Sequence, residues 1–413
     1  MINKITVLSL LFCTAKIFSQ SNNQTSSPYS LFGLGRLNEA GVGKTNALGK
    51  SGIAYSSETE LNNLNPASYA GILKNSFLFD IGIKGEKNNM ATIDDQKTTT
   101  TYNFSNISMA LGLTDKSAIG FSLSPYSDVG YFLQGVTGTV EGNTDVYSSD
   151  IEGSGGLNNA MLTYGRKFNS KLNLGVNASY YFGKIEETEV ITINNDYLSI
   201  NEKSYYRGIR FGVGAQYKVN EKLDVAAVVN LPVSLSGKQD RLVNKIVNYY
   251  GAQVEDTEGR DISSFKLPLE FTIGAKYVFE EVLTVNADYK HSFWSAANME
   301  DNLGSFTDQD FIGIGFEYFR NKNRYSYFDR IRYRLGFNAD NGYLEVAGAR
   351  VQNVAVTSGI GLPLSRSVNS FLNLSYSYGQ RGVITTTLTE EKYHLFTVNI
   401  SLSDIWFKKR KYD

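Results

Sequence analysis

From about residue 75 to the C-terminus, the chain repeats segments of about ten residues in which apolar and polar side chains alternate. In the last segment the apolar positions are Phe396, Val398, Ile400 and Leu402, and the polar positions are Thr397, Asn399, Ser401 and Ser403. Successive side chains of a strand point to opposite faces, so each segment has one apolar and one polar face. The pattern predicts many β-strands, either of a soluble sandwich or of a membrane barrel whose polar faces line the lumen.

The first residues of the chain favour the membrane barrel. Lys4 precedes an apolar run over residues 5–13, and small and polar residues follow up to Ser19 and Gln20. This is the pattern of a secretory signal peptide, and we expect cleavage near Ser19. The run is too short for a spanning helix, and no later stretch approaches the roughly 18 apolar residues that such a helix needs. We therefore expect a strand-built protein in the outer membrane of a Gram-negative bacterium.

The connections between the predicted strands test this interpretation. We place about fourteen strands over residues 75–405, an even number that returns both ends of the barrel to the periplasm. Short turns, such as those at 114–116 and 168–170, alternate with long polar segments that we predict to be loops. These loops are residues 129–156, 186–203 and 237–263. A soluble sandwich has no reason to sort its connections in this way, so the predicted fold is an all-β transmembrane antiparallel barrel.

The composition agrees with an exported barrel. The 27 Tyr and 24 Phe suit the aromatic girdles of a membrane barrel, and the net charge of −1 gives no indication of a nucleic-acid partner. The single cysteine, Cys13, lies in the predicted signal peptide, so the mature chain can form no disulfide or thiolate metal site. A lipid anchor at Cys13 is the alternative. The preceding Phe12 argues against it, because lipidation signals place a small residue there.

Residues 20–74 lack the alternating pattern and are rich in glycine. A barrel of this size encloses more space than one layer of side chains fills, so we predict that this segment lies in the lumen as a plug. A disordered periplasmic tail is the alternative, but apolar residues such as Phe32 and Leu34 argue against disorder. The predicted organisation is a signal peptide at 1–19, a plug at 20–74, a barrel at 75–405 and a basic periplasmic tail at 406–413.

Two short motifs make the chain resemble a known family. Residues 47–55 read ALGKSGIAY and residues 64–67 read LNPA. With the strand count, they are similar to the long-chain fatty acid and aromatic hydrocarbon transporters of the outer membrane. The resemblance implies a lumenal plug called a hatch, a nearby hydrophobic site, and lateral release of substrates into the membrane beside a kinked strand. The hatch and ligand candidates are Phe32, Leu34, Asn65, Pro66 and Ala67.

Charged residues on the polar faces of the predicted strands are expected in the lumen. With a hatch present they should pair with one another and with hatch groups, because charges away from bulk water need partners. These charges are Glu270, Lys276, Asp288, Lys290, Glu317, Arg332 and Arg334. We expect the lateral opening around Ser124, Pro125 and Tyr126, since proline removes a hydrogen bond from the strand ladder.

The sequence contains no recognisable catalytic or metal-binding pattern. Residues 41–45, GVGKT, resemble the end of a phosphate-binding loop, but Asn38 stands where that motif requires its first glycine. The two histidines, His291 and His394, lie in predicted strands, and Ser292 points to the opposite face from His291. We therefore predict no enzyme activity, no cofactor and no metal site.

Two functions fit these expectations. The leading one is an outer-membrane channel for passive uptake of small hydrophobic compounds, either long-chain fatty acid-like or aromatic, with lateral release driven by the hydrophobic effect. The alternative is a structural or adaptor barrel in a larger outer-membrane assembly or secretion complex, which docks protein partners through its long loops. An unselective porin is a third hypothesis, but a closed hatch should prevent ion conduction. The expected partners are outer-membrane lipid, a hydrophobic small molecule and proteins of such a complex.

Overall fold

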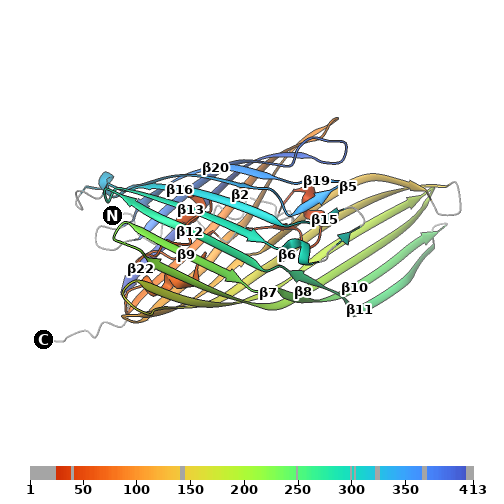
Figure 1. Cartoon of the computed structure of the whole chain (residues 1–413). Helices are drawn as coiled ribbons and strands as arrows, with labels where there is room; N and C mark the ends of the chain where they lie inside the picture. The colour runs from red at the N-terminus through yellow and green to blue at the C-terminus, as the bar shows by residue number, and fades with distance from the viewer. Residues whose placement is uncertain are drawn as a thin grey trace, which may run out of the picture.

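Fourteen antiparallel strands close into a barrel in the computed structural model (Figure 1). The prediction of an all-β barrel of about fourteen strands is confirmed. The structure describes residues 25–38, 41–139, 145–247, 250–297, 300–301, 304–320, 326–364 and 370–405. The predicted signal peptide at 1–19 and the predicted tail at 406–413 lie outside these ranges.

The wall of the barrel runs from β2 to β22, which pair with each other and close it. Its segments are β2 (Ser76–Ala91), β3 (Gln96–Thr114), β4 (Ser117–Pro125), β5 (Ser127–Thr139), β6 (Val146–Lys167), β7 (Leu172–Ile193), β8 (Asp196–Lys218), β9 (Leu223–Asn230), β10 (Val233–Val247), β11 (Tyr250–Leu267), β12 (Glu270–Phe279), β13 (Leu283–Ser292), β16 (Gln309–Tyr318), β17 (Arg332–Asp340), β20 (Asn353–Pro363), β21 (Phe371–Arg381) and β22 (Glu390–Ile405). A small sheet at the outer mouth contains β14 (Glu300–Asp301), β15 (Gly304–Phe306), β18 (Leu344–Val346) and β19 (Ala349–Arg350). The segments β4 and β5, β9 and β10, and β11 and β12 each form one barrel strand with a break in it.

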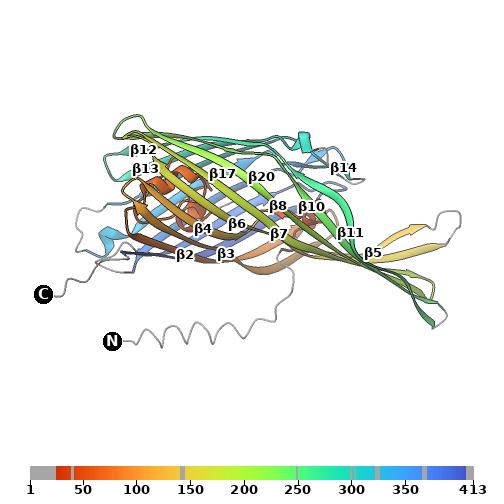
Figure 2. The ribbon, with the colours of Figure 1, turned by 90° about the horizontal axis from the view of Figure 1, so that it is seen from below.

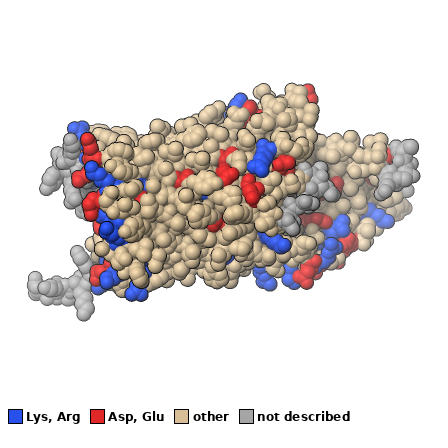
Figure 3. Space-filling view, in the orientation of Figure 1, with Lys and Arg blue, Asp and Glu red and all other residues tan. Residues whose placement is uncertain are grey.

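The apolar faces of the strands point outward and form a band around the barrel. On β7, Leu174, Val176 and Tyr180 are 41–51 % exposed, and the charged side chains of Lys184 and Glu186 follow on the same face. Figure 3 shows the result as a zone with few charged side chains between two charged ends. Such an uncharged outer band fits the hydrocarbon core of a bilayer. The polar faces point inward, as the alternation predicted.

Residues 25–38 and 41–72 lie inside this barrel, and we call them the hatch (Figure 2). Their elements are η1 (Pro28–Leu31), β1 (Arg36–Leu37), η2 (Gly43–Ala47) and η3 (Pro66–Gly71). The short helix η3 packs against β4, β6, β7 and β8, whereas η2 packs against β17, β20, β21, β22 and β2. The remaining helices are η4 (Trp294–Ala297) and η5 (Phe328–Arg330), and no described helix is long and apolar enough to cross a membrane.

Glycines on the inner face of the wall make room for the hatch. A Cβ atom at Gly175 would lie 2.2 Å from the carbonyl carbon of Pro66, and one at Gly336 would lie 2.1 Å from the amide nitrogen of Gly49. The wall glycines with such contacts to the hatch are Gly120, Gly165, Gly175, Gly214, Gly274, Gly313, Gly315, Gly336 and Gly359. Any side chain at these positions would meet hatch atoms, so much of the glycine in the strands is explained by close packing rather than by turns.

Six strands continue on one side of the barrel beyond the apolar band. They pair in the order β5, β6, β7, β8, β10 and β11, and we call their outer halves the projecting sheet (Figures 1 and 2). Strand β7 has 22 residues and β8 has 23, although about 9–11 residues suffice to cross a bilayer. The prediction of loops at 129–156, 186–203 and 237–263 is therefore wrong for most of their length. Both faces of these outer halves meet water, so their polar sequences resemble those of loops.

A proline stands at each of the three broken barrel strands. Pro125 ends β4, Pro232 separates β9 from β10, and Pro268 separates β11 from β12. Proline has no backbone N–H to donate to a ladder, so the strand can bend where it leaves the barrel wall. The buried guanidinium of Arg210 donates hydrogen bonds to the carbonyl oxygens of Leu231 (2.8 Å) and Pro268 (2.6 Å), which satisfies acceptors at two of the breaks.

Candidate functional site

A buried cluster of five charged side chains joins the hatch to the wall. Lys44 and Glu60 come from the hatch, Glu317 from β16, and Arg332 and Arg334 from β17. The Nζ atom of Lys44 lies 3.0 Å from Oε1 of Glu317 and 3.7 Å from Oε2 of Glu60. The Nε atom of Arg334 lies 2.7 Å from Oε2 of Glu317, and Arg332 contacts Glu60 directly. We call this group the ionic cluster.

The ionic cluster is held by electrostatics in a site shielded from water. Burial by itself would raise the pKa of Glu60, but the positive charges of Arg332, Lys44 and Arg334 outweigh burial and lower this pKa. The hydroxyl of Tyr55 also donates to Glu60 at 3.1 Å, and the ammonium of Lys44 lies 3.3 Å from the centre of the Tyr55 ring. Lys44, which belongs to the phosphate-loop-like motif, therefore serves as an ion-pair partner of the wall.

The Asn-Pro-Ala tripeptide begins η3 and lies on the wall. The Asn65 side chain accepts a hydrogen bond from the Ala67 amide at 2.9 Å and so caps the helix, whose first residue is Pro66. Its amide group donates to the carbonyl of Ile53 at 2.9 Å, which ties two hatch segments together. The tripeptide is buried against β7 and β8.

The other predicted lumenal charges are also on the inner face of the barrel. Each of three has a partner: Glu270 contacts Arg210 at 3.0 Å, Lys276 contacts Asp224 at 2.5 Å, and Asp288 accepts from the hatch amides of Gly52 (2.6 Å) and Ile53 (3.0 Å). Lys290 lies 5.3 Å from the ring of Phe311. The structure thus brings Glu317, Arg332 and Arg334 into one cluster and distributes the remaining four around the lumen.

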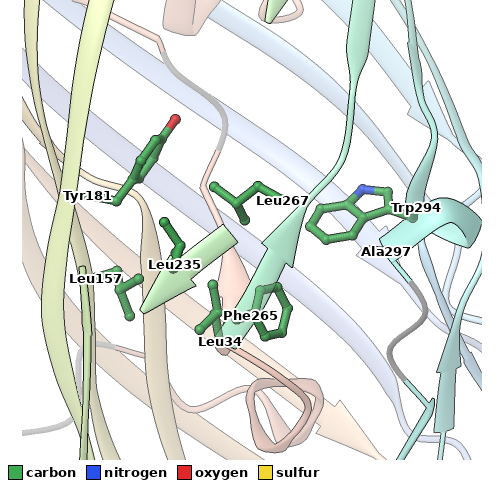
Figure 4. Packing of buried hydrophobic residues seen from close by; sticks show 8 residues of the cluster. All are labelled: Leu34, Leu157, Tyr181, Leu235, Phe265, Leu267, Trp294 and Ala297. Atoms are coloured by element: carbon green, nitrogen blue, oxygen red, sulfur yellow. The ribbon is translucent and has the colours of Figure 1, made fainter. Parts of the chain in front are cut away.

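Two apolar clusters lie toward the outer mouth, and each contains one predicted ligand candidate. Leu34 is 1 % exposed and packs into the cluster drawn in Figure 4. Its members are Leu34, Leu157, Tyr181, Leu235, Phe265, Leu267, Trp294 and Ala297. Phe32 packs with Tyr29, Leu344, Val351 and Leu388. Both clusters consist of side chains in mutual contact, so these two residues stabilise the hatch and the outer mouth.

Two adjoining cavities of about 110 and 240 Å³ remain in the lumen. They share Arg36, Asn38, Lys50 and Arg381 as wall residues. They also share the apolar side chains of Leu37 and Met161, and the rest of their walls mixes charged and amide groups with apolar and aromatic side chains. The hydrophobic site implied by the resemblance would need mainly apolar walls, whereas the walls of both cavities are mixed.

The wall is interrupted beside Ser124, Pro125 and Tyr126. Strand β3 pairs with β4 only from Ile107 onward, and among the described residues its outer part, 96–106, pairs with β2 alone. Beyond the break at Tyr126, β5 bends away from β3 and pairs on that side with β1 of the hatch. The side gap, as we call it, therefore lies between residues 96–106 of β3 and the start of β5.

The first described residues of the hatch cover the side gap from within. Ser26 accepts a hydrogen bond from the hydroxyl of Thr99 on β3, and Ser30 accepts one from the amide of Gly130 on β5 at 3.1 Å. Tyr29, between them, donates to the carbonyl of Thr389 before β22. The start of the hatch thus bridges the two strands that fail to pair.

A disulfide can test this closure. We expect Ser26→Cys with Thr99→Cys to crosslink in high yield on mild oxidation, because the two side-chain oxygens are in direct hydrogen-bond contact. The matched control is Ser26→Cys with Thr98→Cys, since residue 98 points to the opposite face of β3. Mass spectrometry of the digested protein measures the crosslink. Equal yields for the two pairs would show that the segment does not lie across the gap.

Sequence reasoning missed the hatch half of the ionic cluster, Lys44 and Glu60. The one available signal was the presence of a lysine and a glutamate in a glycine-rich segment predicted to be enclosed, where a charge needs a partner. It also missed Arg36 and Asp128, which lie 3.8 Å apart where β1 pairs with β5. The part of the chain that the structure describes contains no group of three or more residues suited to holding a metal ion.

Comparisons with known proteins give a family and a fold. A family model described as BamG matches residues 1–413, and no curated protein sequence matches the chain. The toluene transporter TodX of Pseudomonas putida is 17 % identical, with a TM-score of 0.65, and the match covers 90 % of this chain and all of TodX. The toluene transporter TbuX of Ralstonia pickettii is 13 % identical, with a TM-score of 0.59 and coverage of 88 % and 99 %. A Pseudomonas aeruginosa FadL homologue is 12 % identical, with a TM-score of 0.60 and coverage of 90 % and 98 %.

Proposed function

The chain belongs to the BamG family, and we propose that it is a structural or adaptor barrel that docks protein partners in a larger outer-membrane assembly. The observation that carries this proposal is the projecting sheet. About half of β7 and of β8 lies beyond the apolar band, where strands are not needed to cross the membrane. A six-stranded sheet that stands outside the bilayer offers a large, rigid surface to another protein.

The side chains at the outer end of the projecting sheet support protein contact. Tyr250 is 81 % exposed and Val254 is 55 % exposed, although both lie beyond the apolar band. Tyr197 and Ile246 on the neighbouring strands are also exposed. The strand pairing places Tyr197 and Ile246 on one face of the sheet and Tyr250 on the other. Large apolar side chains exposed to water outside the membrane favour contact with a partner, because such contact removes them from water.

The packing inside the lumen favours a structural barrel over a transport channel. The ionic cluster, the capped helix η3 and the amide contacts of Asp288 attach the hatch to opposite sides of the wall. The two cavities beside the hatch have walls that mix charged and amide groups with apolar side chains, and neither is a continuous apolar channel. A filled barrel of this kind holds a constant shape, which a docking platform requires.

Passive uptake of a small hydrophobic compound is the second candidate. It is favoured by one specific observation, the side gap beside Ser124, Pro125 and Tyr126, which would give a lateral exit into the membrane. The fold that the chain shares with toluene transporters is consistent with this role. The start of the hatch, which bridges the gap, would have to move before any compound could leave.

Shortening one hairpin of the projecting sheet tests the proposed function. Residues 188–201 are replaced by Asn-Gly, so that the paired residues Glu187 and Glu202 flank a two-residue turn. We expect the unmodified protein, purified in mild detergent from its own membranes, to carry other subunits in a fixed ratio, and the shortened protein to lose them. The readout is the stoichiometry of the purified complex.

The matched control shortens a hairpin outside the projecting sheet. Residues 89–98 are replaced by Asn-Gly between the paired residues Asn88 and Thr99 of β2 and β3. This variant should keep the subunits, and both variants should keep the gel mobility of a folded barrel. A monomer without subunits, combined with uptake of toluene or oleate into vesicles, would instead support the transport candidate.

A further inference from the structure

Strand β11 is the last strand of the projecting sheet, and one of its edges is open. Among the described residues β11 pairs with β10 and with no other strand. At its base, Phe265 and Leu267 are buried in the apolar cluster of the lumen (Figure 4). Residues 250–261 extend beyond that cluster, and most of them are exposed. We call these twelve residues the free edge.

An open edge of this length presents unused hydrogen-bonding groups. Along a strand the backbone N–H and C=O groups of alternate residues point to the same side, so about half of those on the free edge face away from β10. Proteins block such edges with proline, with lysine and other charged side chains, with bulges or by covering them. The free edge contains no proline, and all twelve residues lie in β11; its two bulges against β10 are at Val254 and at residues 258–259, where Gly259 has a φ of +63°. It is therefore able to pair with another strand.

The free edge is acidic. It carries Glu255, Asp256, Glu258 and Asp261 but only one basic residue, Arg260. Two of the carboxylates contact cations of β10: Glu255 lies 3.3 Å from Arg241, and Asp261 lies 3.7 Å from Lys238. The Asp261 side chain is nevertheless 88 % exposed. Figure 3 shows the charged side chains that gather at this end of the molecule.

We propose that the free edge binds an extended, basic segment of a partner protein, which adds to the projecting sheet as a further strand. Backbone hydrogen bonds would supply the pairing, and lysine or arginine side chains of the segment would face the carboxylates. A second copy of this chain fits poorly, because two free edges brought together would place acidic residues opposite acidic residues. The proposal rests on the proposed docking function and assigns its site and the chemistry of its partner.

Defined peptides test strand addition. The probe is a fluorescent ten-residue peptide of alternating lysine and valine, titrated by anisotropy against the full-length protein in detergent at low salt. One comparison peptide has methyl groups on alternate backbone nitrogens, and the other has glutamate in place of lysine. We expect both to bind at least about tenfold more weakly, because one loses backbone donors and the other meets like charges.

A charge variant tests the site. Glu255→Gln, Asp256→Asn, Glu258→Gln and Asp261→Asn together should weaken binding of the lysine peptide by about tenfold, as expected for several exposed charge contacts. The matched control neutralises four exposed carboxylates elsewhere, with Asp94→Asn, Asp95→Asn, Glu280→Gln and Glu281→Gln. The control should bind like the unmodified protein. Both variants are first checked for the gel mobility of a folded barrel.

A photoreactive group at the centre of the lysine peptide shows where the peptide binds on the protein. We expect its crosslinks within residues 250–261. The proposal is overturned if the methylated peptide binds as tightly as the lysine peptide, if the control variant loses as much affinity as the edge variant, or if the crosslinks map elsewhere. Self-association that the edge variant abolishes would overturn it in favour of a second copy. If the lysine peptide does not bind but hairpin shortening still removes subunits, the docking function is supported and only the free edge is excluded as the docking site.

Discussion

Replacing Glu60 by glutamine is expected to release the hatch from β16 and β17 and to open the barrel to ions. In the unmodified protein, two carboxylates face three cations in the ionic cluster. Without the charge of Glu60, the buried cations Lys44, Arg332 and Arg334 would share Glu317 alone. Removal of one partner from a buried ion pair costs about 3–5 kcal/mol, so the population with a detached hatch should rise at least about a hundredfold.

Two measurements follow the hatch in the Glu60→Gln variant. Ion conductance in planar bilayers should rise, and backbone amides of residues 43–71 should exchange with deuterium faster while those of the wall stay protected. Glu58→Gln is the matched control, since Glu58 is exposed and lies two residues away in the same segment. If amide protection of the hatch is the same in both variants, the ionic cluster does not hold it in place.

Replacing Gly175 by valine is the second change for which we expect a large effect. Its Cβ atom would lie 2.2 Å from the carbonyl carbon of Pro66 and 2.4 Å from the amide nitrogen of Ala67. Both are backbone atoms of η3, which cannot turn away as a flexible side chain would. Overpacking of this kind costs about 1–3 kcal/mol or more, and we expect η3 to be displaced from β7.

The variant should remain a folded barrel, because the outward faces of its strands are unchanged. The expected result is faster proteolysis and faster amide exchange in residues 61–72, with unchanged gel mobility of the barrel. Gly251→Val is the matched control, since no atom lies within 4 Å of its Cβ position. Equal protection of η3 in the two variants would mean that the glycine surface of the wall is not needed for hatch docking.

Much of the barrel could be predicted from the sequence alone. In the final strand, Phe396 and Val398 alternate with Thr397 and Asn399, and this alternation depends only on contact with lipid on one side and the lumen on the other. The same logic placed Glu317, Arg332 and Arg334 on the inner face. Glycine-rich residues without alternation indicated a separate segment for the lumen.

The projecting sheet was not predictable in the same way. Residues 186–203 form strands with water on both faces, so neither face has to be apolar and the periodic signal fades. The open edge of β11 was not predictable either, because the sequence of a strand does not show how many neighbouring strands it pairs with. Pro125, Pro232 and Pro268 marked the breaks, but only the structure distinguishes a break within a strand from its end.

The sequence by itself determined a strand-built membrane barrel with a separate lumenal segment, because lipid imposes a repeating pattern on every strand that crosses it. The tertiary structure alone decided which groups meet inside. Lys44 and Glu317 are 273 residues apart in the chain, and no periodicity links them. Their contact follows from the curvature of the closed wall and from the glycines that let the hatch approach it, and these are properties of the assembled fold.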